Sequence, residues 1–296
     1  MNKGIWYALG AYACWGLFPI YWKWLHQVGA LEIISHRIIW SCVMLLGVVL
    51  LTRQWQAFRR AALNARLLRV YAVAAVLLTI NWLTYVWAVN AGFIVESSLG
   101  YFINPLISVL LGVIVLRERL RPMQWIPIGL ATAGVIFLTV AYGSLPWIAL
   151  TLAFSFGTYG LVKKMAPLSS LYGLTLETTI VFIPALVYLL FAEFTSQGAF
   201  LHNGTISDVL MIGAGVVTTI PLLLFASATR RIPLSLVGIL QYISPTLQFL
   251  LGVLVYGEPF SPVQFVGFGI VWIALIIFGV EGFINHRTQP VAVIAE

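Results

Sequence analysis

Charged side chains are scarce in this chain. Only 8% of its 296 residues are Asp, Glu, Lys or Arg, whereas 61% are hydrophobic and the mean hydropathy is +1.00. So few polar side chains cannot cover the surface of a water-soluble globule of this length. The composition therefore predicts a protein embedded in a lipid bilayer. It also argues against a nucleic-acid partner, because loops that flank membrane spans explain the formal charge of +7.

Cysteines are few and catalytic motifs are missing. The two cysteines, Cys14 and Cys42, both lie in apolar runs, so the sequence supports neither a disulfide framework nor a thiolate metal site. It contains no His-Glu-x-x-His, no Gly-x-Ser-x-Gly and no nucleotide-binding glycine loop, and its four histidines lack the spacing of metal ligands. We therefore expect no catalytic residues, no metal and no cofactor, and we expect that the protein is not an enzyme.

Long apolar runs fill most of the chain. A helix needs about 20 apolar residues to cross the hydrocarbon core of a bilayer. Ten runs come close to this length: 4–22, 33–52, 70–90, 95–116, 123–141, 146–162, 171–192, 208–228, 233–256 and 262–282. The sequence therefore predicts an all-α polytopic membrane protein with ten transmembrane helices.

Positive charge falls on alternate loops, which supports this number of spans. Fourteen of the sixteen basic residues lie on one predicted side: Lys3, Arg53, Arg59, Arg60, Arg66, Arg69, Arg117, Arg119, Arg121, Lys163, Lys164, Arg230, Arg231 and Arg287. Because cytoplasmic loops are rich in Lys and Arg, we expect both termini in the cytoplasm. The basic stretch 54–69 also carries Trp55 and Phe58, and we expect it to form an interfacial helix on anionic lipid.

The chain repeats itself at a fixed offset. Eleven of the thirty positions in 101–130 are identical to those in 241–270, and with one more residue of offset Gly16 falls on Gly157. The predicted units are a first five-helix repeat, 1–141, a second, 142–284, and a cytoplasmic tail, 285–296. Because each repeat holds an odd number of spans, the second must be inverted relative to the first, as in many carriers.

Two of the predicted spans, the fourth and the ninth, each carry a polar stripe on one helical face. The first stripe consists of Ser97, Tyr101, Asn104 and Ser108. The equivalent positions of the second copy hold Val237, Gln241, Ser244 and Gln248. Polar side chains at membrane depth are costly unless they face protein or water, so we expect both stripes to face inward and to bind substrate. The alternative is hydrogen bonding between helices.

A proline interrupts each of these two spans. Pro105 and Pro245 come one residue after Asn104 and Ser244. A proline inside a helix removes a backbone hydrogen bond and frees a carbonyl group. We expect the two prolines to act as hinges, and a static kink is the alternative.

Aromatic and amide side chains on the first and third spans extend the candidate substrate site. Tyr12 and Lys23 lie on the first span, and Asn81, Trp82 and Tyr85 lie on the third. Aromatic rings with scattered amides suit an organic molecule better than a bare ion. For the aromatic residues the alternative is the belt at the membrane interface.

Ionisable residues inside the spans are candidates for charge recognition. We expect Arg37, in the second span, either to bind an anionic group of the substrate together with Lys23 or to reach the outer headgroups. Glu177, in the seventh span, is a candidate proton carrier. Arg37 and Glu177 occupy equivalent repeat positions, and inversion places them too far apart for a salt bridge. Glu118 and Glu258 each precede a helix, whose positive end we expect them to stabilise.

Several motifs carry a resemblance to a known family. They are Leu99–Pro105, Leu116–Leu120 with Met123–Trp125, His36–Trp40, and Gln241–Pro245 with Tyr256–Glu258. Together they resemble the RarD branch of the EamA transporters, in the drug/metabolite transporter superfamily, over nearly the whole chain. The resemblance implies a ten-helix carrier of the bacterial inner membrane, with a central cavity lined by spans 1, 3, 4, 6, 8 and 9. It also favours export of amino acids or amphipathic metabolites.

These observations favour a secondary transporter that moves a small organic metabolite or drug across the inner membrane by alternating access, with export as the expected direction. The expected partners are that substrate and the lipid bilayer, and the sequence leaves the oligomeric state open. A passive channel or facilitator for small solutes is the alternative. A membrane protein without transport activity is a remote alternative.

Overall fold

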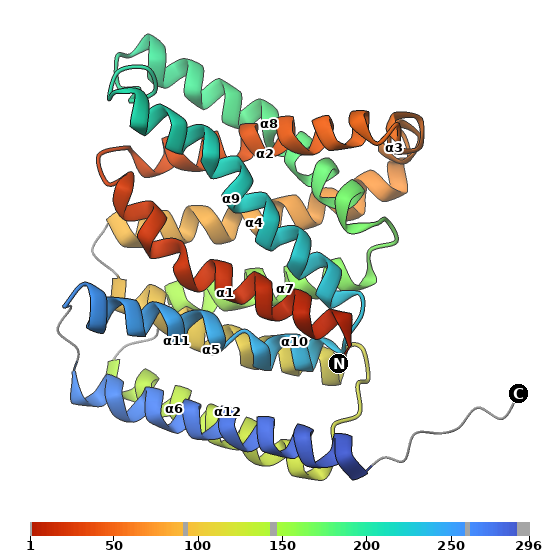
Figure 1. Ribbon diagram of the computed structural model, residues 1–296, viewed down its shortest axis with the longest axis vertical. Coiled ribbons are helices and arrows are strands. Elements are labelled where there is room, and N and C mark those ends of the chain that lie inside the picture. The colour runs from red at the N-terminus through yellow and green to blue at the C-terminus, as the bar shows by residue number, and fades with distance from the viewer. Residues whose placement is uncertain (1, 91–93, 143–146, 258–260, 289–296) are drawn as a thin grey trace, which may run out of the picture.

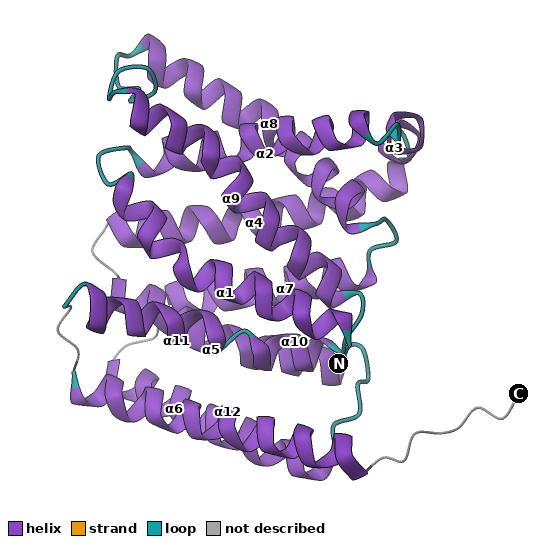
Figure 2. Ribbon diagram, viewed as in Figure 1, coloured by secondary structure: helices purple, strands orange, loops and turns teal. Residues whose placement is uncertain are grey.

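The computed structural model describes residues 2–90, 94–142, 147–257 and 261–288. Regular secondary structure in these ranges is helical (Figure 2), so the prediction of an all-α protein is confirmed. The helices are α1 (Lys3–Trp24), α2 (Ala30–Leu51), α3 (Trp55–Ala62), α4 (Ala65–Asn90), α5 (Ile94–Ile114), α6 (Trp125–Tyr142), α7 (Trp147–Met165), α8 (Ser170–Phe194), α9 (Thr205–Thr229), α10 (Leu234–Leu240), α11 (Ile243–Leu250) and α12 (Pro262–Thr288).

The predicted spans correspond to helices, with one departure. The ninth span is divided into α10, α11 and a π-helical turn, Leu251–Val255. Six helical segments of the described chain are long and apolar enough to cross a membrane: Ala30–Leu51, Ala65–Ala88, Pro122–Val140, Ser170–Phe194, Thr205–Thr229 and Leu234–Val255. Shorter apolar segments, Gly100–Ile114 and Phe265–Glu281, lie in α5 and α12. The chain is therefore a multi-pass membrane protein.

The ends of α2 and α8 share a Thr-x-Gln sequence and a hydrogen-bond pattern. Each helix ends at a threonine, Thr52 or Thr195, whose hydroxyl donates to the carbonyl four residues earlier. The next residue, Arg53 or Ser196, has a φ of 56° or 54°, in the left-handed region. The amide of the following glutamine donates to the carbonyl five residues before it, at 2.9 Å in both cases. Both helices therefore end in a Schellman-type motif.

The chain after α5 matches the chain after the π-helical turn Leu251–Val255 in the same way. Arg117 and Gly257, which occupy equivalent positions in the two copies, have φ angles of 55° and 63°. The preceding amide, of Leu116 or Tyr256, donates to the carbonyl five residues earlier, which makes a wide turn. The repeat in the sequence therefore extends to backbone conformation.

Helices of the two halves alternate in the bundle (Figure 1). α5 packs against α7 and α10, and α2 packs against α8 and α9. α4 packs against α7 and α8, α1 packs against α9 and α11, and α6 pairs with α12 at one edge of the bundle. Exchanging α1 with α7, α2 with α8, α4 with α9, α5 with α10–α11 and α6 with α12 converts these contacts into one another.

Two glycines allow equivalent close contacts between the halves. A Cβ atom at Gly16 would lie 2.7 Å from the Cβ of Leu247, and one at Gly157 would lie 2.7 Å from the Cγ2 of Ile107. Small residues let membrane helices approach closely. Gly16 therefore brings α1 against α11, and Gly157 brings α7 against α5.

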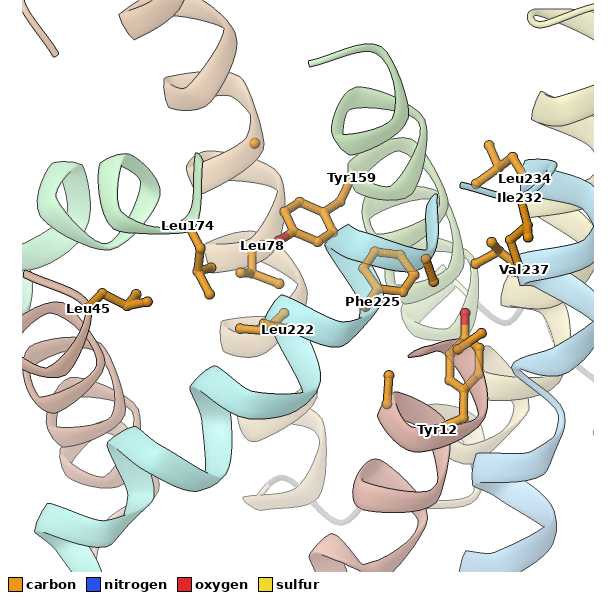
Figure 3. Packing of buried hydrophobic residues seen from close by; sticks show 14 residues of the cluster. Tyr12, Leu45, Leu78, Tyr159, Leu174, Leu222, Phe225, Ile232, Leu234 and Val237 are labelled. Atoms are coloured by element: carbon orange, nitrogen blue, oxygen red, sulfur yellow. The ribbon is translucent and has the colours of Figure 1, made fainter. Parts of the chain in front are cut away.

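Aromatic rings fill the centre of the largest hydrophobic cluster. Figure 3 shows Tyr159 of α7, Phe225 of α9 and Tyr12 of α1 in a row. The rings of Tyr159 and Phe225 are stacked, with centroids 6.0 Å apart and planes 11° apart, and Phe225 meets Tyr12 edge to face at 6.4 Å. Leu78 and Leu222 continue this cluster between α4 and α9. Core packing therefore joins both halves of the chain.

Large apolar side chains also cover the outer faces of the helices. Examples of exposed residues are Val43 on α2, Ile183 on α8, Ile212 on α9 and Ile276 on α12. Contiguous exposed apolar surface of this kind suits hydrocarbon rather than water. The outward faces are thus those expected of a protein surrounded by lipid.

Basic segments gather at one end of the bundle. The start of α1, the basic helix α3 and the end of α12 lie on the same side, at the right of Figure 1. The loop between α8 and α9 lies at the opposite end (Figure 1). The basic stretch that was predicted to lie at the interface does form a helix, α3, and its Phe58 is buried against Tyr172, with ring centroids 6.0 Å apart.

Glu118 stabilises the start of a helix, but not the helix that follows it. Its carboxylate accepts hydrogen bonds from the amides of Leu234 and Ser235, at 2.7 and 2.9 Å, and from the hydroxyl of Ser235 at 2.7 Å. The capped helix is therefore α10 of the other half rather than α6. The reason is that the chain reverses at Arg117, which returns the carboxylate to Gly112, where α5 meets α10. Glu258 lies outside the described residues.

Candidate substrate site

A small pocket lies between α2, α4, α8 and α9. Its walls are mostly apolar, and its polar lining residues are Ser41, Thr79, Glu177, Thr178, Thr218 and Thr219. Ligand sites typically combine apolar walls with a few polar groups in this way. In the numbering of the predicted spans these helices are 2, 3, 7 and 8. The pocket thus shares spans 3 and 8 with the cavity that the family resemblance implied, whereas its other walls are spans 2 and 7.

Equivalent residues of the two repeats line this pocket together. The equivalent pairs are Ile38 and Thr178, Ser41 and Val181, Leu78 and Thr218, Thr79 and Thr219, and Trp82 and Leu222. Because both members of each pair contribute to the lining, the pocket lies at the boundary between the two halves of the chain.

Glu177 forms a buried ion pair at this pocket. The Nζ of Lys163 on α7 donates to Oε1 of Glu177 at 2.6 Å, and the hydroxyl of Tyr159 donates to Oε2 at 3.1 Å. The two charged side chains are only 3% and 2% exposed. The prediction that Lys163 lies in a cytoplasmic loop is wrong, because this residue belongs to the last turn of α7 and its side chain is directed inward to Glu177. Glu177 is thus paired within its own half, and Arg37 has other partners.

Arg37 lies between aromatic rings at another edge of the pocket. Its Nε donates to the hydroxyl of Thr218 at 2.8 Å. The guanidinium carbon lies 4.9 Å from the ring centroid of Trp22 and 4.4 Å from that of Trp82. Tyr85 and Tyr101 lie near the guanidinium group. Four helices other than its own, α1, α4, α5 and α9, therefore surround this one cation.

The surroundings of Arg37 and Glu177 are also equivalent in the repeat. Glu177 holds the position in the second copy that Arg37 holds in the first. Lys163 likewise corresponds to Trp22, at the slightly longer offset that relates Gly157 of α7 to Gly16 of α1. One half therefore holds a cation against an indole ring where the other half holds an ion pair. The described residues contain no ion pair between Arg37 and Glu177, in agreement with their predicted separation.

Among the predicted site residues, the structure brings Arg37, Trp82, Tyr85 and Tyr101 together. The rings of Tyr85 and Tyr101 meet edge to face, with centroids 5.8 Å apart. Asn81 has a structural role, because its amide donates to the carbonyl of Leu152 at 2.9 Å and to the hydroxyl of Ser155 at 3.1 Å. It ties α4 to α7 through both hydrogen bonds.

Other predicted residues lie away from the pocket. Tyr12 is fully buried in the aromatic core, and its hydroxyl has no hydrogen-bond partner. Lys23 is exposed, with its Nζ 3.3 Å from the ring centroid of Tyr256. The ring contact of Lys23 is therefore with Tyr256, whereas the ring contacts of Arg37 are with Trp22 and Trp82.

Four polar residues of the two stripes are buried against protein, and Tyr101 and Gln248 are half-buried. Asn104, Ser108, Gln241 and Ser244 are each no more than 5% exposed, and none lines the pocket between α2, α4, α8 and α9. Gln248 donates to the carbonyl of Trp15 on α1 at 3.0 Å and to the hydroxyl of Ser244 at 3.4 Å. The side-chain oxygens of Asn104 and Gln241 have no hydrogen-bond partner. The side chain of Ser97 lies outside the described residues.

The two prolines have different consequences for their helices. α5 continues through Pro105, whereas the equivalent helix breaks at Gln241 and Tyr242, just before Pro245. Pro245 has no amide hydrogen to donate to the carbonyl of Gln241, and the amide of Ser244 donates to it instead, at 3.0 Å. The second copy therefore contains a discontinuous helix where the first does not.

Sequence reasoning missed the hydroxyl groups of the pocket. Ser41, Thr178, Thr218 and Thr219 lie in apolar spans, where a lone Ser or Thr is ordinary because it can donate to its own helix. One signal was present, since Thr219 is the repeat equivalent of Thr79. Recognising a pocket from it requires knowing that α4 and α9 face each other.

Comparisons with known proteins identify the family. The sequence model of the EamA-like transporter family matches residues 2–140 and again residues 145–280. The chain is 48% identical to "Uncharacterized transporter YojE" of Bacillus subtilis (strain 168), over 94% of this chain and 93% of that protein. It is 45% identical to "Protein RarD" of Streptomyces exfoliatus, over 93% of this chain and 88% of that protein.

A solved structure shares the fold. It is described only as "Crystal structure of protein" and superposes with a TM-score of 0.69 at 16% identity, over 93% of this chain and 97% of that one. At this identity the similarity concerns the fold alone. The match of both halves to one family model and the two relatives confirm the resemblance seen in the sequence, and the chain belongs to the EamA-like transporter family, with RarD proteins among its relatives.

Proposed function

We propose that this protein is a secondary transporter that carries a small organic molecule outward across the inner membrane by alternating access. In this proposal ten membrane spans form two inverted five-helix repeats, and both termini are cytoplasmic. The substrate binds in the pocket between α2, α4, α8 and α9. The single observation that carries the proposal is that equivalent residues of both repeats line this pocket, because a site on the axis between inverted repeats is accessible in turn from each side.

Several features support inversion of the repeats. The helix contacts are preserved when the two halves are exchanged. The equivalent helix ends after α2 and α8, with their shared Schellman-type motif, lie at opposite ends of the bundle (Figure 1). The family model also matches each half separately.

The residues of the pocket have distinct proposed roles. Trp82 and the hydroxyl groups of Thr178 and Thr218 contact the substrate, and Arg37 with its ring of aromatic residues recognises one end of it. The buried pair of Lys163 and Glu177 couples transport to movement of a proton, because a carboxylate that changes partner at membrane depth can release or accept one. Helix movement centres on Pro105 and Pro245, next to the break between α10 and α11.

The test begins with purified protein. A thermal-shift screen of amino acids, nucleosides and amphenicols finds ligands, because a molecule that binds the folded state raises its stability. Uptake of the ligand with the largest shift is then measured in liposomes. We expect saturable uptake, and accelerated exchange when unlabelled solute is present on the opposite side. Failure of every screened solute to cross would refute transport, and unsaturable flux with single-channel current would favour the passive channel.

A crosslink tests alternating access directly. Phe102 of α5 and Tyr242, at the break between α10 and α11, are in contact, with ring centroids 6.4 Å apart. In the double variant Phe102→Cys and Tyr242→Cys, a reducible bis-methanethiosulfonate crosslinker joins α5 to this break. We expect transport to stop on crosslinking and to return on reduction, whereas each single variant is insensitive to the reagent. Undiminished transport by the crosslinked protein would contradict movement between these helices.

A further inference from the structure

The charges around the pocket do not balance. Three ionisable side chains lie at it or border it: Arg37, Lys163 and Glu177. Lys163 and Glu177 neutralise each other at 2.6 Å. No carboxylate of the described chain forms an ion pair with Arg37, so one positive charge remains at the edge of the pocket. A cation without a counter-charge inside a membrane span is costly in free energy. Such a residue is therefore a candidate for a functional site.

The contacts of Arg37 leave room for an anion. Of its guanidinium nitrogens, Nε donates to Thr218, and in the described structure the two terminal nitrogens have no acceptor. The indole faces of Trp22 and Trp82 offset part of the cost of burying the charge, but a ring face accepts no conventional hydrogen bond. The terminal nitrogens of a guanidinium match the two oxygens of a carboxylate. The terminal nitrogens of Arg37 thus lack the carboxylate acceptor that their geometry fits.

Comparison of the two repeats shows what is missing. At the position of Arg37 the second copy has Glu177, and at the position of Trp22 it has Lys163. The second copy therefore supplies both charges of its own pair, whereas the first supplies only the cation. A carboxylate brought by a ligand would form an ion pair with Arg37 in the first copy, as Glu177 forms one with Lys163 in the second.

We propose that the transported substrate is an organic carboxylate. Its carboxylate group pairs with the terminal nitrogens of Arg37, and its apolar body occupies the pocket against Ile38, Leu78 and Leu222. Thr218, which holds Nε and also lines the pocket, joins the two parts of the site. This assignment rests on the proposed transport function and specifies the class of molecule carried.

A lipid headgroup is a poorer fit to the same donors. Arg37 is directed to α9 through Thr218 and lies between rings of α1 and α4, so the side chain does not extend along the outside of α2 to the membrane surface. Lys23, which is exposed next to Tyr256, is placed better for headgroups. A phosphate group from lipid is therefore an outcome to be tested rather than the ligand proposed.

The test uses acids and amides of the same shape. Purified full-length protein in neutral detergent is titrated with acetate and acetamide, phenylacetate and phenylacetamide, and indole-3-acetate and indole-3-acetamide, and the melting temperature is recorded. We expect the aromatic acids to raise it and their amides to have little effect. Charged hydrogen bonds of this kind give a difference in affinity of about tenfold or more.

Variants assign the effect to Arg37. In Arg37→Gln the preference for acid over amide should disappear, and in Arg37→Lys, which keeps the charge without the fork, it should be reduced. Arg231→Gln is the matched control, because Arg231 also lies over an aromatic ring, that of Tyr7 at 5.1 Å, but is exposed at the basic end of the bundle. The control should keep the full preference. Melting of the unliganded variants shows whether each is folded.

Several results would overturn the inference. One is the absence of any acid that stabilises the wild-type protein more than its amide, and another is an unchanged preference in Arg37→Gln. Stabilisation by phosphatidylglycerol through Arg37, without an effect of the acids, would assign this residue to lipid. Saturable liposome transport of a neutral or cationic solute would leave the proposed transport function intact while rejecting a carboxylate substrate, so the two proposals fail separately.

Discussion

Removing one member of the buried pair at the pocket should destabilise the protein far more than removing both. Lys163 and Glu177 are 2.6 Å apart and almost completely buried, and the hydroxyl of Tyr159 also donates to Glu177. In Lys163→Met the carboxylate of Glu177 is left buried without its cation. In Glu177→Gln the ammonium group of Lys163 is left buried without its anion. The double variant leaves neither charge.

The magnitude follows from burial. Loss of one partner from a buried ion pair costs about 3–5 kcal/mol, whereas replacing both partners with neutral groups is often close to neutral. We therefore expect each single variant to lose about 3–5 kcal/mol and the double variant to lose much less than either. The coupling energy of the cycle should accordingly be at least about 3 kcal/mol. Glu193→Gln is the matched control, because Glu193 and its partner His202 are 58% and 57% exposed and an exposed pair contributes about 0–1 kcal/mol.

The assay is reversible unfolding in mixed micelles of dodecyl maltoside and SDS, followed by helical circular dichroism. The free energies of the wild type, the two single variants and the double variant form one double-mutant cycle. Single variants that lose less than about 1 kcal/mol, or a double variant that loses the sum of the two, would refute a buried pair isolated from water.

Three further predictions concern contacts between helices. Gly215→Ala should lose about 1–3 kcal/mol of stability in the same micelle assay, because the added Cβ would lie 2.5 Å from the Cβ of Trp40, whereas Gly47→Ala meets no atom within 4 Å and should be tolerated. Glu118→Ala should speed hydrogen exchange of the first amides of α10, measured by mass spectrometry, because it removes their acceptor, at a cost of about 1–3 kcal/mol. Asn81→Ala should lower the melting temperature and leave the affinity for a transported ligand unchanged, because its hydrogen bonds go to α7; weakened binding with normal stability would make Asn81 a substrate residue.

The helices of this fold could be predicted from the sequence because the signal for each helix lies within its own residues. Length and hydropathy locate α2, α8 and α9 without knowledge of neighbours. The division of the ninth span was not accessible, because Pro105 and Pro245 offer the same local signal and only one helix is broken. The difference between them arises from packing around each copy.

The residues of the candidate site were predicted only in part, for the same reason. Arg37, Trp82, Tyr85 and Tyr101 were recognised as unusual side chains in apolar spans, and they do meet in space. Lys163 was misplaced, because a lysine near a helix end usually extends to the headgroups. Its burial depends on α8, which presents a carboxylate beside it, and no pattern within α7 indicates that neighbour.

The break between α10 and α11 has one more consequence. Residues 241–242 correspond to residues 101–102, where α5 is continuous, so one inherited element exists in two shapes within a single molecule. If the halves exchanged these shapes, the bundle would reach a second arrangement with the same kinds of helix contacts, facing the other way. The balance between the two arrangements would then depend on positions where the copies have diverged, such as Tyr101 and Gln241. Under the proposed mechanism, the divergence of the repeats, rather than their similarity, would set which side of the membrane the protein faces at rest.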